Sequence, residues 1–322
     1  MEIETQNRMK VAKGADMGYD VIGDIHGQAA KLDALLKKLG YVQKASGWVP
    51  PVGRQAIFLG DLIDRGPEQI KAVTSVRRMI DAGHARSVMG NHELNAIGFA
   101  TVNPQVPGEF LRKHSAKNMN QHKAFLAEVG QGSLLHRELV DWFKTLPPML
   151  DLSQIRVVHA WWHQPYVDLL IPNLRGGRIE QEFLDSVFVK DSLPYQAMEG
   201  LTKGLEITLP NGASFVDHQE VERFEVRTKW WHENARNFRD VAIIEEQQRY
   251  RVPDHPLPPD YVGQTVQGTP IFIGHYWMKG RPMLQSPKVA CVDYSAADNG
   301  PLVAYRWDGE SVLNEKNFVE AG

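Results

Sequence analysis

Residues 19–27 read YDVIGDIHG, a short apolar run that ends in a Gly-Asp loop. Residues 32–39 then carry leucines at helical spacing, until a glycine ends the pattern. This order predicts a strand, a polar loop and a helix, which together form the first half of a βαβ unit. Open α/β sheets place their sites at the carboxyl ends of strands, so Asp24 and His26 are the first candidates for a functional site.

The same plan occurs a second time in residues 56–66, which read AIFLGDLIDRG. The apolar half predicts a strand, and the loop after it carries Asp61 and Asp64. Proline is favoured at the start of a helix, so Pro67 is expected in the first turn of a helix that reaches residue 82.

Three further strand-like runs end on polar side chains, at Asn91, His159 and His275. Two more apolar runs follow, at residues 289–292 and 302–307. Alternating strands and helices near the amino terminus, with more strands near the carboxyl terminus, favour an α/β fold.

Five strand ends therefore offer carboxylate, imidazole or amide oxygen, the donors that hard and borderline divalent metals prefer. They are Asp24 with His26, Asp61, Asn91, His159 and His275. One Asp-x-His after a strand is weak evidence, because both residues also occur in turns for structural reasons. Five such clusters at successive strand ends indicate a metal site.

The bulk composition excludes several classes of protein. The 322 residues are 43% hydrophobic and carry a net charge of -3, so no global charge favours nucleic acid or an anionic membrane. The single cysteine, Cys291, excludes an internal disulfide framework and fits a reducing compartment. Residues 1–17 lack the apolar stretch of a secretory signal, and no run approaches the roughly 20 apolar residues of a membrane span. A cytoplasmic location is expected.

The region from about residue 165 to 268 shows the least regular pattern, because it is charged, aromatic and interrupted by prolines. We expect one domain over residues 1–322, with this region as a cap or insertion. Histidines without a partner pattern, among them His122 and His218, are assigned structural roles.

The motifs as a set resemble those of the calcineurin-like metallophosphoesterases, with the phosphoprotein phosphatase branch the most similar. The resemblance rests on GDIHG at residues 23–27, GDLIDRG at residues 60–66, GNHE at residues 90–93, His159, and GH at residues 274–275. It implies an α/β (α+β) fold in which two mixed sheets form a four-layer αββα sandwich.

The resemblance also implies a dinuclear metal centre, in which a hydroxide that bridges two metal ions attacks phosphorus. It assigns one ion to Asp24 and His26, the other to Asn91, His159 and His275, and a bridging role to Asp61. Two divalent ions about 3.5 to 4 Å apart suit in-line attack on a phosphate. Mn²⁺ is the expected metal, and Fe, Zn, Ni and Co also tolerate these ligands.

The same resemblance assigns His92 as the general acid that protonates the leaving oxygen, with Asp64 orienting its ring. Arg65 would grip phosphate oxygens with its planar guanidinium, and Asn91 would also contact the phosphate. Arg227 is the candidate for a second phosphate-binding arginine from the cap. For Arg65, the alternative is a surface residue that pairs with a neighbouring acid.

These assignments predict a hydrolase of phosphate monoesters, acting on a phosphorylated protein or a small phosphoester. The main alternative is a symmetrical dinucleoside polyphosphate hydrolase, because such enzymes share this motif order; Asp64 and Glu93 favour the monoesterase. A non-catalytic phosphate-binding module would be expected to have lost a ligand or the acid. A nuclease would need a basic groove, which the sequence does not show.

Overall fold

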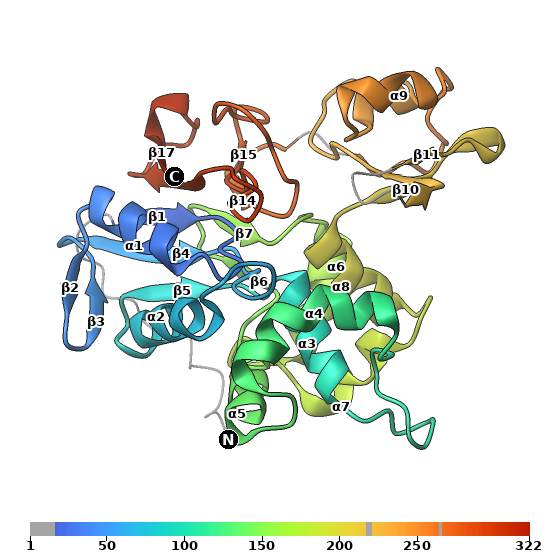
Figure 1. The fold of residues 1–322 in the computed structure, drawn as a ribbon. Helices are drawn as coiled ribbons and strands as arrows, with labels where there is room; N and C mark the ends of the chain where they lie inside the picture. The colour runs from blue at the N-terminus through green and yellow to red at the C-terminus, as the bar shows by residue number, and fades with distance from the viewer. Residues whose placement is uncertain (1–16, 217–220, 264–265) are drawn as a thin grey trace, which may run out of the picture.

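The computed structural model describes residues 17–216, 221–263 and 266–322. Residues 1–16, which were considered above for a secretory signal, and His218 lie outside the described residues. Figure 1 shows the arrangement of the helices and strands.

The first sheet has five strands in the order β17-β16-β1-β4-β5. Their bounds are β1 (Gly18–Ile22), β4 (Arg54–Phe58), β5 (Ala85–Ser87), β16 (Leu302–Trp307) and β17 (Phe318–Ala321). Strands β1, β4 and β5 run parallel, as βαβ units require, whereas β16 pairs antiparallel with β1 and β17 antiparallel with β16. The sheet is therefore mixed.

The second sheet has four strands in the order β15-β14-β7-β6. Their bounds are β6 (Met149–Asp151), β7 (Arg156–Val158), β14 (Ile271–Ile273) and β15 (Val289–Cys291). Strand β14 pairs parallel with both of its neighbours, and β6 pairs antiparallel with β7. This sheet is also mixed, and it joins segments more than 100 residues apart in the sequence.

Alternate side chains along the strands separate two apolar cores. Val21 and Ile57 of the first sheet share a fully buried cluster with Val157 and Phe272 of the second. Because successive side chains of a strand point to opposite faces, these residues mark the faces on which the two sheets meet. The side chains on the outer faces of the two sheets belong to the larger cluster, which also contains buried residues of the helices. The predicted layered fold of two mixed sheets is confirmed.

Helices cover the outer faces of both sheets. Helices α1 (Ala29–Lys38) and α2 (Gln69–Asp81) contact the first sheet, and α6 (Gln164–Leu170) and α8 (Leu193–Lys203) contribute buried residues to the cluster that includes the outer face of the second sheet. Beside them lie α3 (Asn91–Ala100), α4 (Ala116–Val129) and α5 (Leu134–Phe143).

Pro67 lies before α2, and the prediction that it stands in the first turn of that helix is wrong. The carboxylate of Glu128 in α4 accepts hydrogen bonds from the backbone N–H groups of Gln69 (2.6 Å) and Ile70 (3.0 Å). The N–H groups at the start of a helix have no acceptor within the helix, and Glu128 supplies one for those of residues 69 and 70. The helix therefore begins at Gln69.

In the described part of the region predicted as a cap, most elements are short. They are β8 (Leu174–Arg175), β9 (Arg178–Ile179), α7 (Gln181–Leu184), β10 (Glu206–Thr208), β11 (Phe215–Val216), β12 (Glu222–Arg223), β13 (Glu225–Arg227) and α9 (Phe238–Val241), besides α6 and α8. Its later part has a small apolar cluster of its own around Val226 and Phe238. Figure 1 shows β10, β11 and α9 above α6 and α8 in this view. We propose that these elements form a cap.

The sequence did not predict the hairpin of β2 (Val42–Lys44) and β3 (Gly47–Val49). It lies between α1 and β4 and carries no candidate site residue. Among the described residues, no helix is long and apolar enough to cross a membrane.

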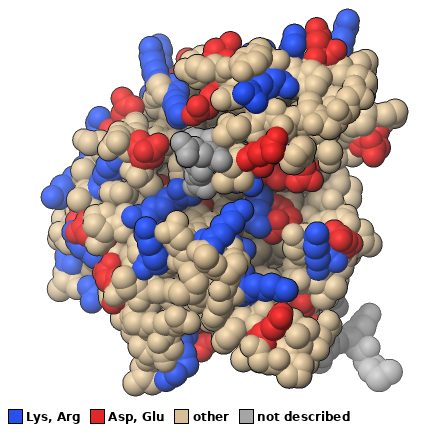
Figure 2. Space-filling view, turned by 45° about the vertical axis from the view of Figure 1, so that its right-hand side comes forward, with Lys and Arg blue, Asp and Glu red and all other residues tan. Residues whose placement is uncertain are grey.

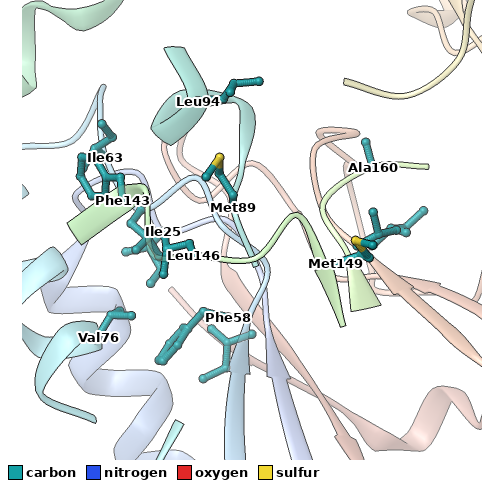
Figure 3. Packing of buried hydrophobic residues seen from close by; sticks show 14 of the residues in the cluster. Ile25, Phe58, Ile63, Val76, Met89, Leu94, Phe143, Leu146, Met149 and Ala160 are labelled. Carbon is teal, nitrogen blue, oxygen red and sulfur yellow. The ribbon is translucent and has the colours of Figure 1, made fainter. Parts of the chain in front are cut away.

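The loops that carry the candidate site are anchored by their apolar residues. Ile25 follows Asp24 and Ile63 precedes Asp64, and both side chains are fully buried. Figure 3 shows them among the side chains of the large cluster, near Phe143 and Leu146. Each loop therefore presents polar side chains in one direction while its apolar side chains hold it to the core.

Gly60 permits the close approach of two of these loops. Its φ is +88°, and a Cβ built at this position would lie 2.2 Å from the backbone nitrogen of Gly90. Gly53 provides a matched comparison, because its φ is +77° but nothing lies within 4 Å of its built Cβ.

We expect Gly60→Ala to lower the free energy of unfolding by at least about 2 kcal/mol more than Gly53→Ala. Both variants place alanine in a left-handed backbone conformation, but only the alanine at position 60 forces the loops apart. Urea unfolding of both variants in chelator measures the difference. Equal effects would show that the close contact contributes nothing.

Candidate metal centre

Several candidate site residues have left-handed backbone conformations, which side chains other than glycine rarely adopt. The φ angle is +47° at His26, +48° at Asp61, +71° at Asp64 and +68° at His275. Such strain persists only where the surrounding structure enforces it, and it is frequent at functional sites. Here it occurs at the carboxyl ends of β1, β4 and β14, so it turns their side chains towards a common centre.

The Asp61 carboxylate lies at that centre. Its Oδ2 is 3.6 Å from Nε2 of His26, 3.4 Å from Nε2 of His159 and 3.9 Å from Nε2 of His92. Ligand atoms that share one tetrahedral ion at about 2.1 Å stand about 3.4 Å apart. The spacing from Asp61 to His26 and His159 therefore fits shared metal ions better than direct hydrogen bonds, whereas the proposed general acid His92 has its own partner in Asp64.

Two groups of donor atoms meet at Asp61. One consists of His26, Asp61 and His92, the other of Asp61, His159 and His275, and within each group the donor atoms lie within 4.8 Å of one another. All are buried. Asp61 belongs to both groups, which is the placement that a bridging ligand requires.

Unpartnered atoms test whether this site suits metal ions. Oδ1 of Asp24, Nε2 of His26 and Nε2 of His275 are buried and have no hydrogen-bond partner among the described residues. Buried polar atoms are nearly always paired, so three orphans in one site call for a ligand. Each is a carboxylate oxygen or an imidazole nitrogen, and the residues present therefore fit divalent ions.

Asp24 reaches the centre because Gly274 leaves it room. A Cβ built on Gly274 would lie 2.2 Å from Oδ1 of Asp24. The other oxygen, Oδ2, accepts a hydrogen bond from the backbone N–H of His275 at 3.0 Å. Burial, and then the buried carboxylate of Asp293, raise the pKa of Asp24 well above its usual value. Sequence reasoning missed Asp293, which follows β15 without a motif of its own.

Backbone carbonyl groups orient two of the imidazoles. Nδ1 of His26 lies 2.8 Å from the carbonyl oxygen of Ile63, and Nδ1 of His159 lies 2.6 Å from that of Leu59. A ring that donates from Nδ1 presents its Nε2 lone pair to a metal. Burial lowers the pKa of His159, but the carboxylates of Asp61 and Asp24 outweigh this effect and raise it to about 10. A proton therefore competes with a metal ion for Nε2.

Asn91 joins the second group. Its Oδ1 lies 2.9 Å from Nδ1 of His275 and 3.2 Å from Nε2 of His159. Burial, and then the charge of Arg227, lower the pKa of His275 well below its usual value. The ring is therefore kept as a neutral imidazole, which is the form that binds metals.

His92 and Asp64 form a buried pair beside the first group. Nδ1 of His92 lies 2.5 Å from Oδ2 of Asp64. Burial alone would raise the pKa of Asp64, but hydrogen bonds from His122 and His92 outweigh it and lower that pKa to about 2. The opposite holds for His92: burial favours its neutral form, yet Asp61 and Asp64 raise its pKa. The geometry thus favours an imidazolium next to a carboxylate.

The other oxygen of Asp64 meets a second imidazole, at 2.8 Å from Nδ1 of His122. Sequence reasoning assigned His122 a structural role and missed this contact. It lies in α4, 58 residues from Asp64, and no local pattern indicates that this helix packs against the loop.

Glu93 is a further residue whose role the sequence did not reveal. Its Oε2 accepts hydrogen bonds from the backbone N–H groups of Asp61 (2.8 Å) and Gly90 (3.0 Å), and its Oε1 accepts one from Leu62 (2.9 Å). Burial, then the charge of Asp61, raise the pKa of Glu93 to about 7. This side chain ties the Asp61 loop to the start of α3.

The predicted phosphate-binding arginines differ in their surroundings. Arg65 is exposed, and its guanidinium carbon lies 3.9 Å from the ring centroid of Trp277. Arg227 pairs with Glu206 (3.2 Å), although its charge still acts on His275. Sequence reasoning overlooked Arg112, a half-buried cation; burial lowers its pKa, and the charges of Glu199 and Asp64 only partly oppose that shift. Figure 2 shows Lys and Arg side chains gathered around a hollow on one face of the protein.

The comparison with protein families identifies the family of this chain. The family model for calcineurin-like phosphoesterases matches residues 17–266. A bis(5'-nucleosyl)-tetraphosphatase PrpE [asymmetrical] of Oceanobacillus iheyensis is 31% identical over 144 residues, which are 45% of this chain and 55% of that protein. The protein of the same name from Bacillus subtilis is 45% identical over 88 residues, 27% of this chain and 36% of that protein. The chain thus matches about half of the relatives' length or less.

Two solved structures align with nearly the whole chain. A Saccharomyces cerevisiae protein serine/threonine phosphatase with similarity to human phosphatase PP5 has a TM-score of 0.50 at 15% identity, covering 95% of this chain and 79% of that one. A putative diadenosine tetraphosphatase has a TM-score of 0.46 at 16% identity, covering 96% of both chains. At 15% identity, the likeness to the yeast phosphatase concerns the fold alone.

Replacing Asp61 by asparagine is expected to weaken binding at both metal positions, because it removes the one charge that both donor groups share. The loss should exceed the roughly 10- to 100-fold that removal of an outer hydrogen-bond partner costs. Metal analysis of dialysed Asp61→Asn, with the exposed Asp298→Asn as control, measures it. Retention of two ions would refute the shared position.

Glu93→Gln is expected to lower the free energy of unfolding by about 1 to 3 kcal/mol, because its amide –NH2 must face at least one backbone N–H without an acceptor. Glu128→Gln is the matched control, since Glu128 also accepts two N–H groups but is exposed. Urea unfolding in chelator should show the larger loss for Glu93, and an equal loss would contradict the bracing role.

Proposed function

Because the chain belongs to the calcineurin-like phosphoesterase family, we propose that it is a metal-dependent hydrolase of dinucleoside polyphosphates. The observation that carries the metal-dependent chemistry is the pair of buried donor groups that share Asp61, together with the unpartnered atoms of Asp24, His26 and His275. Bound at the donors other than His92, two divalent ions would lower the pKa of a water molecule and neutralise negative charge on the phosphate.

His92 would supply the proton for the leaving oxygen, and Arg65 would bind the phosphate. Nε2 of His92 points towards Asp61, while its Nδ1 donates to Asp64. That orientation aims the His92 proton at a leaving oxygen above the donor groups. Arg65 offers two parallel N–H donors to phosphate oxygens, and its stacking on Trp277 limits the orientations of its guanidinium plane.

The substrate is proposed from the relatives. Those with 31% and 45% identity are named as asymmetrical bis(5'-nucleosyl)-tetraphosphatases. Their names support the dinucleotide alternative over a phosphorylated protein, and they favour asymmetrical over symmetrical cleavage. A nucleotide phosphate is a weakly basic leaving group, so this reaction needs little help from a general acid.

A second candidate, hydrolysis of phosphate monoesters, is favoured by the His92–Asp64 pair. An alkoxide or phenoxide is a strongly basic leaving group, and its departure needs a proton in the transition state. A buried imidazolium held by a carboxylate at 2.5 Å supplies that proton. The two candidates therefore differ in how strongly turnover depends on His92.

Chelator-treated protein, with and without Mn²⁺, should be tested on diadenosine tetraphosphate, phenyl phosphate and a phosphoserine peptide. We expect Mn²⁺-dependent cleavage of the dinucleotide to ATP and AMP, with His92→Asn reducing it less than about 10-fold. On phenyl phosphate, the same variant should lose about 10²-fold or more.

The products, the kcat/KM values and the metal dependence together decide between the candidates. Two ADP molecules would indicate symmetrical cleavage. A kcat/KM that is higher for the peptide or phenyl phosphate than for the dinucleotide would overturn the proposed substrate and promote the monoesterase. Equal turnover with and without metal would overturn the proposed chemistry.

A further inference from the structure

A second imidazole holds the oxygen of Asp64 that His92 leaves free. Oδ2 of Asp64 accepts from Nδ1 of His92 at 2.5 Å, and Oδ1 accepts from Nδ1 of His122 at 2.8 Å. The three side chains are at most 5% exposed. Because a carboxylate oxygen accepts hydrogen bonds, both histidines donate from Nδ1 to Asp64.

The surroundings of His122 give its ring no other polar contact. The ring lies between Phe99 and Phe125, with centroid distances of 5.4 and 5.0 Å. Its Nε2 is buried and has no hydrogen-bond partner among the described residues. An imidazole in an apolar pocket is stabilised by whatever partner it has, and here that partner is Asp64.

The helix that carries His122 is joined to the Asp64 loop by a second route. Gln69 accepts a hydrogen bond from the backbone N–H of Asp64 (2.7 Å), and its own backbone N–H donates to Glu128 of α4 (2.6 Å). Gln69, which Glu128 of α4 holds, thus fixes the backbone of Asp64, and His92 and His122 fix its carboxylate.

We propose that His122 is a positioning residue, which fixes the plane of the Asp64 carboxylate so that its Oδ2 stays on Nδ1 of His92 and the His92 Nε2 stays aimed at the metal centre. The proposal rests on the proposed role of His92 as general acid. A carboxylate with one oxygen unpaired in a buried site would turn towards other donors, and the His92 ring would lose its fixed orientation.

The test compares His122→Leu with His122→Asn. Leucine fits the apolar pocket and removes the donor, whereas the asparagine Nδ2 stands close to the position of the histidine Nδ1 and keeps it. With 4-nitrophenyl phosphate, a good leaving group, kcat of His122→Leu should fall by less than about 3-fold; with phenyl phosphate it should fall by about 10-fold or more. His122→Asn should recover most of the loss.

His92→Asn separates this inference from the proposed function. If His122 acts through His92, the double variant His92→Asn/His122→Leu should be no slower on phenyl phosphate than His92→Asn alone. If His92→Asn shows the leaving-group dependence but His122→Leu does not, the positioning role is wrong and the general acid stands. If His92→Asn shows none, both roles are wrong.

A spectroscopic measurement decides the positioning role without a substrate. In protein loaded with diamagnetic Zn²⁺, the proton between His92 and Asp64 should give a low-field resonance. It should shift or vanish in His122→Leu and return in His122→Asn. An unchanged resonance in His122→Leu would overturn the proposal, and equal thermal stability of the two variants would exclude unfolding as the cause of a change.

Discussion

The Asp61 carboxylate is the constraint on which the rest of the structure depends. It is buried, its Oδ2 faces three imidazole nitrogens at 3.4 to 3.9 Å, and its Oδ1 accepts the backbone N–H of His92 at 2.9 Å. A charge in this position is costly unless cations or donors surround it. The left-handed backbone at Asp61 and the hold of Glu93 on its loop are the local means by which the fold keeps it there.

The layered fold explains how so many side chains reach one point. The carboxyl ends of β1, β4, β7 and β14 come from both sheets, and the sheets pack face to face through Val21, Ile57, Val157 and Phe272. The apolar core between the sheets therefore sets the distance between the two donor groups. Glycines at 60 and 274 then allow backbone and carboxylate to approach more closely than any side chain would permit.

The sequence predicted what is local and repeated, and missed what depends on packing across the chain. Each strand before a candidate ligand was found, because apolar runs and Gly-Asp loops are local patterns. The start of α2 was misplaced, since Glu128 determines it from another helix. His122 and Asp293 were missed for the same reason, because each acts on a residue far earlier in the chain: His122 on Asp64, 58 residues away, and Asp293 through its charge on Asp24. Arg227 was named, but its pairing with Glu206 could not be foreseen.

Anomalous diffraction from crystals grown with Mn²⁺ tests the central claim most directly, because it locates the ions without reference to activity. The account predicts two peaks on either side of Asp61 Oδ2, one against Asp24 and His26 and the other against Asn91, His159 and His275. Their separation should be about 3.5 to 4 Å. A single peak, or peaks that do not contact Asp61, would contradict the account.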